Sequence, residues 1–119
     1  MKNNSVFDIK RLFAAFNNSV SGLRNVFKTE VSFRQELLVC VILLPLALYL
    51  GRSAIDKVLL ISSILLILIV ELINSAIETV IDRISADSHE LSGRAKDIGS
   101  AGVFLAIINA VIVWILIIF

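Results

Sequence analysis

Three long apolar runs constrain this chain more than any other feature of its 119 residues. The runs are Leu37–Leu50, Val58–Val70 and Ile98–Phe119, and the second reads VLLISSILLILIV. A helix needs about 20 mostly apolar residues to cross a hydrocarbon core of about 30 Å. Hydrophobic residues make up 58% of the chain, above the usual share in a soluble domain. We therefore expect a single all-α membrane domain with transmembrane helices over 33–50, 55–84 and 97–119, the second extending into the cytoplasm.

The residues before the first run follow a helical pattern. Apolar side chains recur every three or four positions, namely Ile9, Leu12, Phe13, Phe16, Val20, Leu23 and Phe27, with basic residues outside this arc. An apolar face with basic flanks is typical of a helix lying in the membrane surface. We expect such an amphipathic surface helix over 5–28. A helix packed on a soluble core is the alternative, disfavoured because the chain has little soluble core to offer.

Lysine and arginine are distributed unevenly between the loops. Nine of the 11 precede the first apolar run or lie between the second and third runs, while Arg52 and Lys57 lie between the first and second. Cytoplasmic loops carry the excess of basic residues. We therefore expect the N-terminus and the second loop in the cytoplasm and the C-terminus outside. The net charge of only +1 gives no reason to expect a nucleic-acid partner.

A polar stripe follows the second apolar run. Its members, spaced i, i+3, i+4, i+7 and i+11 along one helix face, are Glu71, Asn74, Ser75, Glu78 and Asp82. A charged residue in hydrocarbon costs about 2.5 to 3.5 kcal/mol on insertion scales, so it usually faces a protein interior and marks function. We expect this of Glu71. Glu78 and Asp82 have a simpler alternative, the solvated end of the helix.

Acidic residues from separate segments are expected in one layer. At about 1.5 Å per residue, Glu71 lies about 24 Å inward from Ile55, just inside the cytoplasmic edge of the hydrocarbon. The same measure along the first and third spans brings Glu36, Glu30 and Asp97 to this level. Carboxylates, a lysine and basic loops at such a boundary suit Mg²⁺-assisted phosphoryl transfer. The sequence has no Walker A or kinase glycine loop, so these residues alone indicate only a polar membrane site.

Small residues mark one face of the third span. Gly102, Ala106 and Ala110 repeat every fourth residue, and Gly99 and Asn109 share their face. Small side chains let helices approach closely, so this is a packing face within or between subunits, with Asn109 as a helix-to-helix hydrogen bond. Three helices supply few convergent groups, and a homo-oligomer is therefore expected.

Several motifs resemble the prokaryotic diacylglycerol kinase family. They are FRQE at 33–36, VLLISS at 58–63, VELINSAIETVIDRI at 70–84 and HELSGRAKDIGSA at 89–101. The resemblance covers most of the chain from Gly22 onward, and the combination of ELINSAIE with HELSGRAKD is highly specific. It implies a homotrimeric enzyme of the bacterial cytoplasmic (inner) membrane. The reaction it implies moves the γ-phosphate of MgATP to diacylglycerol and yields phosphatidic acid.

The resemblance also assigns roles to residues of this chain. Glu71 is similar to the family's general base, Glu30 and Glu78 to its Mg²⁺ ligands, and Asn74 to a supporting residue. The expected ATP contacts are Arg11 (with Lys10 as the alternative), Glu30, Glu78, Asp87, Ser88, His89, Lys96 and Asp97. The expected lipid contacts are Ser32, Phe33, Arg34, Gln35, Glu36, Glu71 and Ser100. The positive end of the third helix, beside Lys96 and Asp97, would favour phosphate.

Two points qualify these roles. The family often has tyrosine where this chain has Asn18 and Ser88, so an aromatic contact to the nucleotide is not expected there. Glu30 and Arg34, four residues apart, would alternatively form a structural ion pair worth a few tenths of a kcal/mol.

Three other functions compete with this one. A sister branch with the same architecture phosphorylates undecaprenol. A small oligomeric channel would need polar groups through the full depth, whereas the outer half of the second span offers only Ser62 and Ser63. A non-catalytic assembly protein is disfavoured, because helix packing alone does not explain a glutamate at the depth of Glu71 in the membrane.

Overall fold

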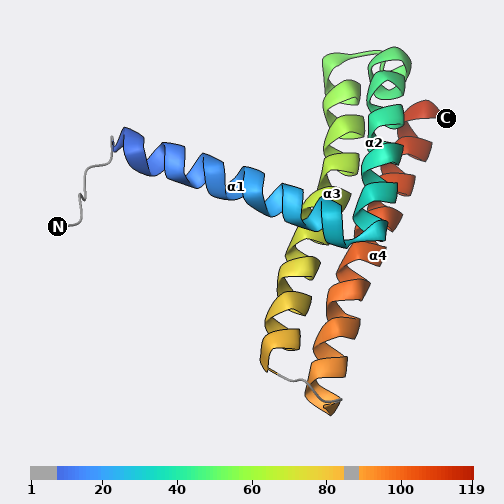
Figure 1. Ribbon diagram of the computed structural model, residues 1–119. Coiled ribbons are helices and arrows are strands. Elements are labelled where there is room, and N and C mark those ends of the chain that lie inside the picture. Colours follow the sequence, from blue (N-terminus) through green and yellow to red (C-terminus); the bar gives the residue numbers. More distant parts are fainter. Residues whose placement is uncertain (1–7, 85–88) are drawn as a thin grey trace. The chain divides into compact units, whose positions relative to one another are not determined.

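The chain folds into four helices and is all-α throughout the part described, residues 8–84 and 89–119 of a computed structural model (Figure 1). The helices are α1 (Ile9–Thr29), α2 (Val31–Leu50), α3 (Ala54–Ile84) and α4 (Glu90–Ile118). The last three are long and apolar enough to cross a membrane. This architecture confirms the predicted class, an all-α membrane protein with one amphipathic and three spanning helices. The chain divides into two compact units between Val31 and Ser32.

The first unit contains α1. Its first turn is capped by Asp8, whose side chain accepts a hydrogen bond from the Arg11 backbone N–H at 3.3 Å. No residue of α1 is buried. Near its start, four apolar side chains line one hollow of about 420 Å³, and each is 65% exposed: Ile9, Leu12, Phe13 and Phe16. An uncovered apolar face of this kind is what a helix at a membrane surface presents to lipid.

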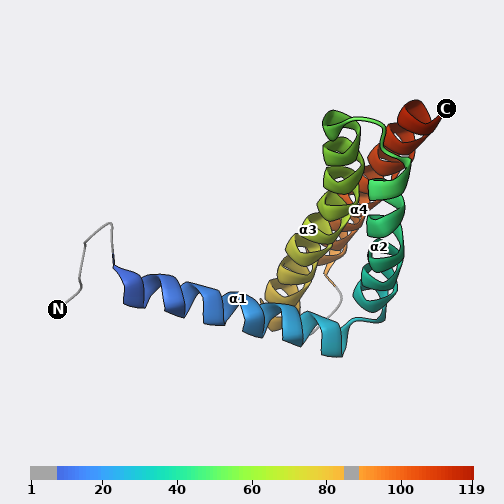
Figure 2. The same cartoon turned by 90° about the horizontal axis from the view of Figure 1, so that it is seen from above.

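The second unit is built on an antiparallel pair, α3 and α4, which lie side by side in both views (Figures 1 and 2). Small residues let these helices approach, as the sequence predicts: Ala106 and Ala110 are buried, and a Cβ built at Gly102 would lie 3.6 Å from Val70 Cγ1. Asn109 is exposed instead. Its predicted hydrogen bond to another helix is therefore not made within the described part of this chain.

Two polar contacts tie the spanning helices together away from the polar stripe. The Trp114 indole N–H of α4 donates to Ser63 Oγ of α3 at 3.1 Å, and Ser63 Oγ donates to the Leu60 carbonyl at 2.8 Å. Cys40 of α2 lies with its Sγ 3.7 Å from the Ile64 carbonyl of α3. Both sites are buried, so these contacts satisfy polar atoms that hydrocarbon would leave unpaired.

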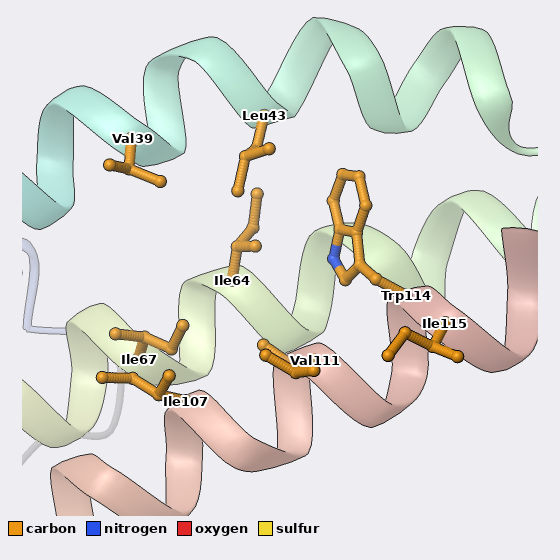
Figure 3. A pocket seen from close by; sticks show the side chains of 9 residues that line it. Val39, Leu43, Ile64, Ile67, Ile107, Val111, Trp114 and Ile115 are labelled. Carbon is orange, nitrogen blue, oxygen red and sulfur yellow. The ribbon is translucent and has the colours of Figure 1, made fainter.

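An apolar groove of about 370 Å³ lies between these three helices (Figure 3). Its lining consists of Val39, Leu43, Ile64, Ile67, Ile107, Ala110, Val111, Trp114 and Ile115. The indole ring of Trp114 points toward α2 across the groove (Figure 3). The groove is lined almost entirely by apolar groups, and the carboxylates of α3 are not part of its lining.

The fourth helix begins earlier than expected. The sequence predicts a span over 97–119, whereas α4 already starts at Glu90. His89 precedes it as the N-cap, and its Nδ1 accepts a hydrogen bond from the Leu91 N–H at 3.0 Å. Residues 90–96 are mostly good helix formers, and Gly93 is tolerated inside them at a cost of about 1 kcal/mol. The helix therefore extends well beyond its apolar part.

Candidate active site

Glu71 is a buried carboxylate of α3 that lies beside the first turn of α2. Its exposed fraction is 5%, and its Oε1 accepts a hydrogen bond from Ser32 Oγ at 3.2 Å. The expectation that Glu71 faces the protein interior is thus confirmed. Ser32 lies in the first turn of α2, so Glu71 is level with the start of that helix. Glu71 therefore accepts a hydrogen bond from a primary alcohol, the Ser32 hydroxyl, at the level where apolar residues give way to polar ones.

The next turn of α3 links Asn74 to Glu78. Asn74 and Ser75 are buried, Glu78 is half-buried, and Asn74 Nδ2 donates to Glu78 Oε1 at 3.3 Å. The amide oxygen of Asn74 is also buried and has no hydrogen-bond partner among the described residues. One oxygen of Glu78 is therefore oriented by an amide that is itself enclosed by protein.

The stripe ends in an exposed ion pair. Asp82 Oδ1 of α3 and Lys96 Nζ of α4 are 2.8 Å apart, with side chains 66% and 44% exposed. Lys96 precedes the apolar part of α4, and its hydrogen bond to Asp82 raises the pKa of the Lys96 ammonium group. Lys96 is thus charged at neutral pH. An exposed pair of this kind contributes little to stability, so another anion can replace Asp82 at modest cost.

Most expected lipid contacts lie in the first turns of α2. Ser32 and Gln35 are exposed, Arg34 and Glu36 are half-buried, and Phe33 is only 3% exposed. Ser100, the further candidate on α4, is exposed. Among these residues, Ser32 contacts Glu71 through its hydroxyl. Phe33 is enclosed by the protein, so its role in this structure is packing.

The expected nucleotide contacts are divided between parts of the chain. His89 and Asp97 are exposed on the second unit. Arg11 is exposed and Glu30 half-buried on the first, so the pairing of Glu30 with Glu78 stays a prediction. Asp87 and Ser88, expected to contact ATP, lie outside the described residues.

The predicted helix dipole beside Lys96 and Asp97 is wrong. Because α4 starts at Glu90, its N-terminal end lies six residues before Lys96, or about 9 Å along the axis. The dipole acts within the first turn, so it does not reach either residue. The N-terminus of the helix lies at His89 instead, whose Nδ1 caps the Leu91 N–H.

Glu78 is the described carboxylate that suits a magnesium ion arriving with a nucleotide. The described residues contain no cluster of three or more His, Cys, Asp or Glu side chains that could hold a metal. Mg²⁺ is commonly bound through only one or two carboxylates together with substrate phosphates. Glu78 supplies a hard oxygen ligand with an oriented carboxylate, which suits such a site.

Four contacts were not predicted from the sequence. They are Ser32 to Glu71, Asp82 to Lys96, Ser63 to Trp114, and the approach of Gly99 to Asn74. The depth estimate already placed Glu71 level with the start of the first span, which is the one signal that could have paired it with Ser32. The other three depend on the rotation of α4 about its axis.

Comparison with known proteins identifies the family. The family model described as "Prokaryotic diacylglycerol kinase" matches residues 17–118. A diacylglycerol kinase of Haemophilus influenzae is 53% identical over 96 residues, covering 81% of each chain. The diacylglycerol kinase of Escherichia coli K12 is 50% identical over 111 residues, covering 93% of this chain and 91% of its own. That of Pseudomonas aeruginosa is 43% identical over 106 residues, covering 89% and 86% respectively. The chain therefore belongs to the prokaryotic diacylglycerol kinase family and is a membrane-embedded lipid kinase.

Proposed function

We propose that this kinase transfers the γ-phosphate of MgATP to the primary hydroxyl of diacylglycerol and produces phosphatidic acid. The observation that carries the proposal is the contact between Ser32 Oγ and Glu71 Oε1 at 3.2 Å. A buried carboxylate that accepts a hydrogen bond from one primary alcohol can accept it from another. General-base catalysis requires this geometry, with heavy atoms about 2.6 to 3.2 Å apart.

Glu71 acts as the base in this mechanism. The lipid hydroxyl donates its hydrogen bond to the Glu71 carboxylate, and the proton passes to Glu71 as the hydroxyl oxygen attacks the γ-phosphorus. The bond between the γ-phosphorus and the oxygen that bridges it to the β-phosphorus breaks, and ADP leaves. Burial of Glu71 beside the first turn of α2 supports this role, because a diacylglycerol hydroxyl lies at the same boundary between hydrocarbon and water.

Glu78 and Glu30 hold the magnesium ion of the nucleotide in this proposal. Bound Mg²⁺ neutralises charge on the phosphates. Asn74 orients Glu78 through the hydrogen bond to Oε1. Arg11 and Lys96 contact phosphate, and Lys96 leaves Asp82 to do so. Asp87, Ser88, His89 and Asp97 complete the nucleotide contacts.

The location follows from the same arrangement. Nine of the 11 basic residues lie on the side of the N-terminus and the second loop, which supports a site at the cytoplasmic face of the bacterial inner membrane. A homotrimer accounts for a site to which one chain contributes few metal ligands. The relatives named above are called diacylglycerol kinases, which favours this lipid over undecaprenol.

Phosphorylation of purified protein in mixed micelles tests the proposal. With MgATP and either diacylglycerol or undecaprenol, we expect labelled phosphate to appear in phosphatidic acid and far less in the undecaprenol product. Faster labelling of undecaprenol would assign the protein to the sister activity. Absence of ATP turnover with both lipids, together with ion flux in proteoliposomes, would instead support a channel.

A further inference from the structure

Gly99 of α4 faces the Asn74 side chain of α3 at very close range. A Cβ built at Gly99 would overlap Asn74 Oδ1 and lie 3.2 Å from Cγ, but it would lie 3.9 Å from Asn74 Cβ. The contact with Oδ1 is too short for a real methyl group, the contact with Cγ is tight, and the contact with Cβ is ordinary. Gly102, one turn further along α4, differs: its built Cβ would meet only Val70 Cγ1 at 3.6 Å. The amide of Asn74 therefore occupies the space that a side chain at position 99 would fill.

The orientation of this amide is set by two neighbours. Asn74 Nδ2 donates to Glu78 Oε1 at 3.3 Å, while Oδ1 is buried against Gly99 without a hydrogen-bond partner. Rotating the amide by half a turn would bring its oxygen to the Glu78 carboxylate, where two acceptors repel each other. Leaving Oδ1 unpaired is unfavourable, so this orientation depends on the hydrogen bond to Glu78 and on the space beside Gly99.

We propose that Gly99 is a positioning residue for the metal-binding carboxylate. By having no side chain, it gives the Asn74 amide the space in which Nδ2 reaches Glu78. This inference rests on the proposed function, in which Glu78 holds the Mg²⁺ of the nucleotide. Gly99 touches neither metal nor nucleotide. It acts on Glu78 indirectly, through the position of the Asn74 amide.

The geometry predicts how a methyl group at position 99 would be accommodated. The overlapping atoms are the end of the Asn74 side chain, which can rotate, while the backbone-proximal Cβ is at an ordinary distance. The amide should therefore turn away and release Glu78 while α3 and α4 stay together. Gly99→Ala should act on Glu78 in the same way as loss of the Asn74 amide.

The test compares Gly99→Ala, Asn74→Ala, the double variant and Gly102→Ala in the full-length protein. Each is assayed for the free Mg²⁺ concentration that gives half-maximal lipid phosphorylation. Binding of Mn²⁺ together with a non-hydrolysable ATP analogue, followed by electron paramagnetic resonance, provides a readout that does not depend on turnover. We expect Gly99→Ala to raise the half-activating Mg²⁺ concentration and weaken Mn²⁺ binding about tenfold, as is usual when a metal ligand loses its outer partner. Gly102→Ala should change neither.

The double variant separates positioning from packing. Once Asn74 is alanine, the methyl group at position 99 has no amide to displace, so the double variant should match Asn74→Ala in metal dependence. A Gly99→Ala protein with normal metal binding would overturn the inference. So would one whose oligomer or thermal stability is lost in both the single and double variants. If Asn74→Ala and Glu78→Gln themselves leave metal binding unchanged, the proposed role of Glu78 fails and this inference fails with it. If those two weaken metal binding and Gly99→Ala does not, only the role of Gly99 is refuted.

Discussion

The Ser32 hydroxyl donates a hydrogen bond to Glu71 Oε1 at 3.2 Å, although 39 residues separate the two in the chain. This contact places the first turn of α2 beside the buried carboxylate of α3. Ser32 is an expected lipid contact and Glu71 is the expected general base, so the hydrogen bond joins two residues of the predicted site. The polar end of one spanning helix thus meets the deepest acidic residue of another.

Glu71→Gln should abolish lipid phosphorylation. The amide keeps the size of the side chain but cannot accept the proton of the lipid hydroxyl, and positioned acid–base groups contribute about 10² to 10⁴ in rate. Turnover in mixed micelles measures the loss, with nucleotide binding and the oligomeric state as controls. Near-normal turnover would remove Glu71 from the role of base.

Ser32→Ala should lower the rate without changing the apparent affinity for ATP. The variant removes the hydroxyl that holds Glu71 Oε1, and a hydrogen bond to a charged group contributes about 1.5 to 3 kcal/mol. We expect a smaller effect than for Glu71→Gln because the carboxylate remains. Kinetics with varied ATP and varied diacylglycerol measure this difference. Ser62→Ala is the matched control, because Ser62 is an exposed serine in the N-terminal half of α3. An equal effect of both changes would argue against a specific role for Ser32.

Lys96→Met should raise the KM for ATP, whereas Asp82→Asn should not. Lys96 is paired with Asp82 at 2.8 Å and must leave it to meet phosphate. Loss of the lysine should raise this KM, and loss of the competing carboxylate should leave it unchanged or lower it. Titrations with ATP at fixed free Mg²⁺ measure both. A raised KM in Asp82→Asn would show that Asp82 assists nucleotide binding instead.

Trp114→Phe should reduce thermal stability by a small amount. The change keeps an aromatic ring in the groove but removes the N–H that donates to Ser63 Oγ at 3.1 Å. Hydrogen bonds between membrane helices average about 0.6 kcal/mol. Unfolding in detergent measures the loss. Ser63→Ala should destabilise by a similar amount, and the double variant should be no worse than the more destabilised single one if the two residues act through one contact.

Much of this architecture could be predicted from the order of the residues alone. In long, nearly continuous apolar runs the backbone must satisfy its hydrogen bonds without water, and a helix does this within a single segment. The spacing of Glu71, Asn74 and Glu78 places them on one face by helical geometry. The high cost of a charge in hydrocarbon indicates that Glu71 faces protein, and its burial confirms this. These conclusions depend only on local periodicity and on the solvent in which each segment lies.

The tertiary structure decided which side chains meet. The spacing of residues within α4 does not specify how that helix is rotated against α3, and this rotation brings Gly99 to Asn74, Lys96 to Asp82 and Trp114 to Ser63. The helix α4 starts at Glu90 because the polar segment before the apolar run is also helical. Hydropathy alone does not predict this earlier start. Periodicity along one helix predicts the face that it buries, whereas the partner of each buried side chain is set by packing between helices.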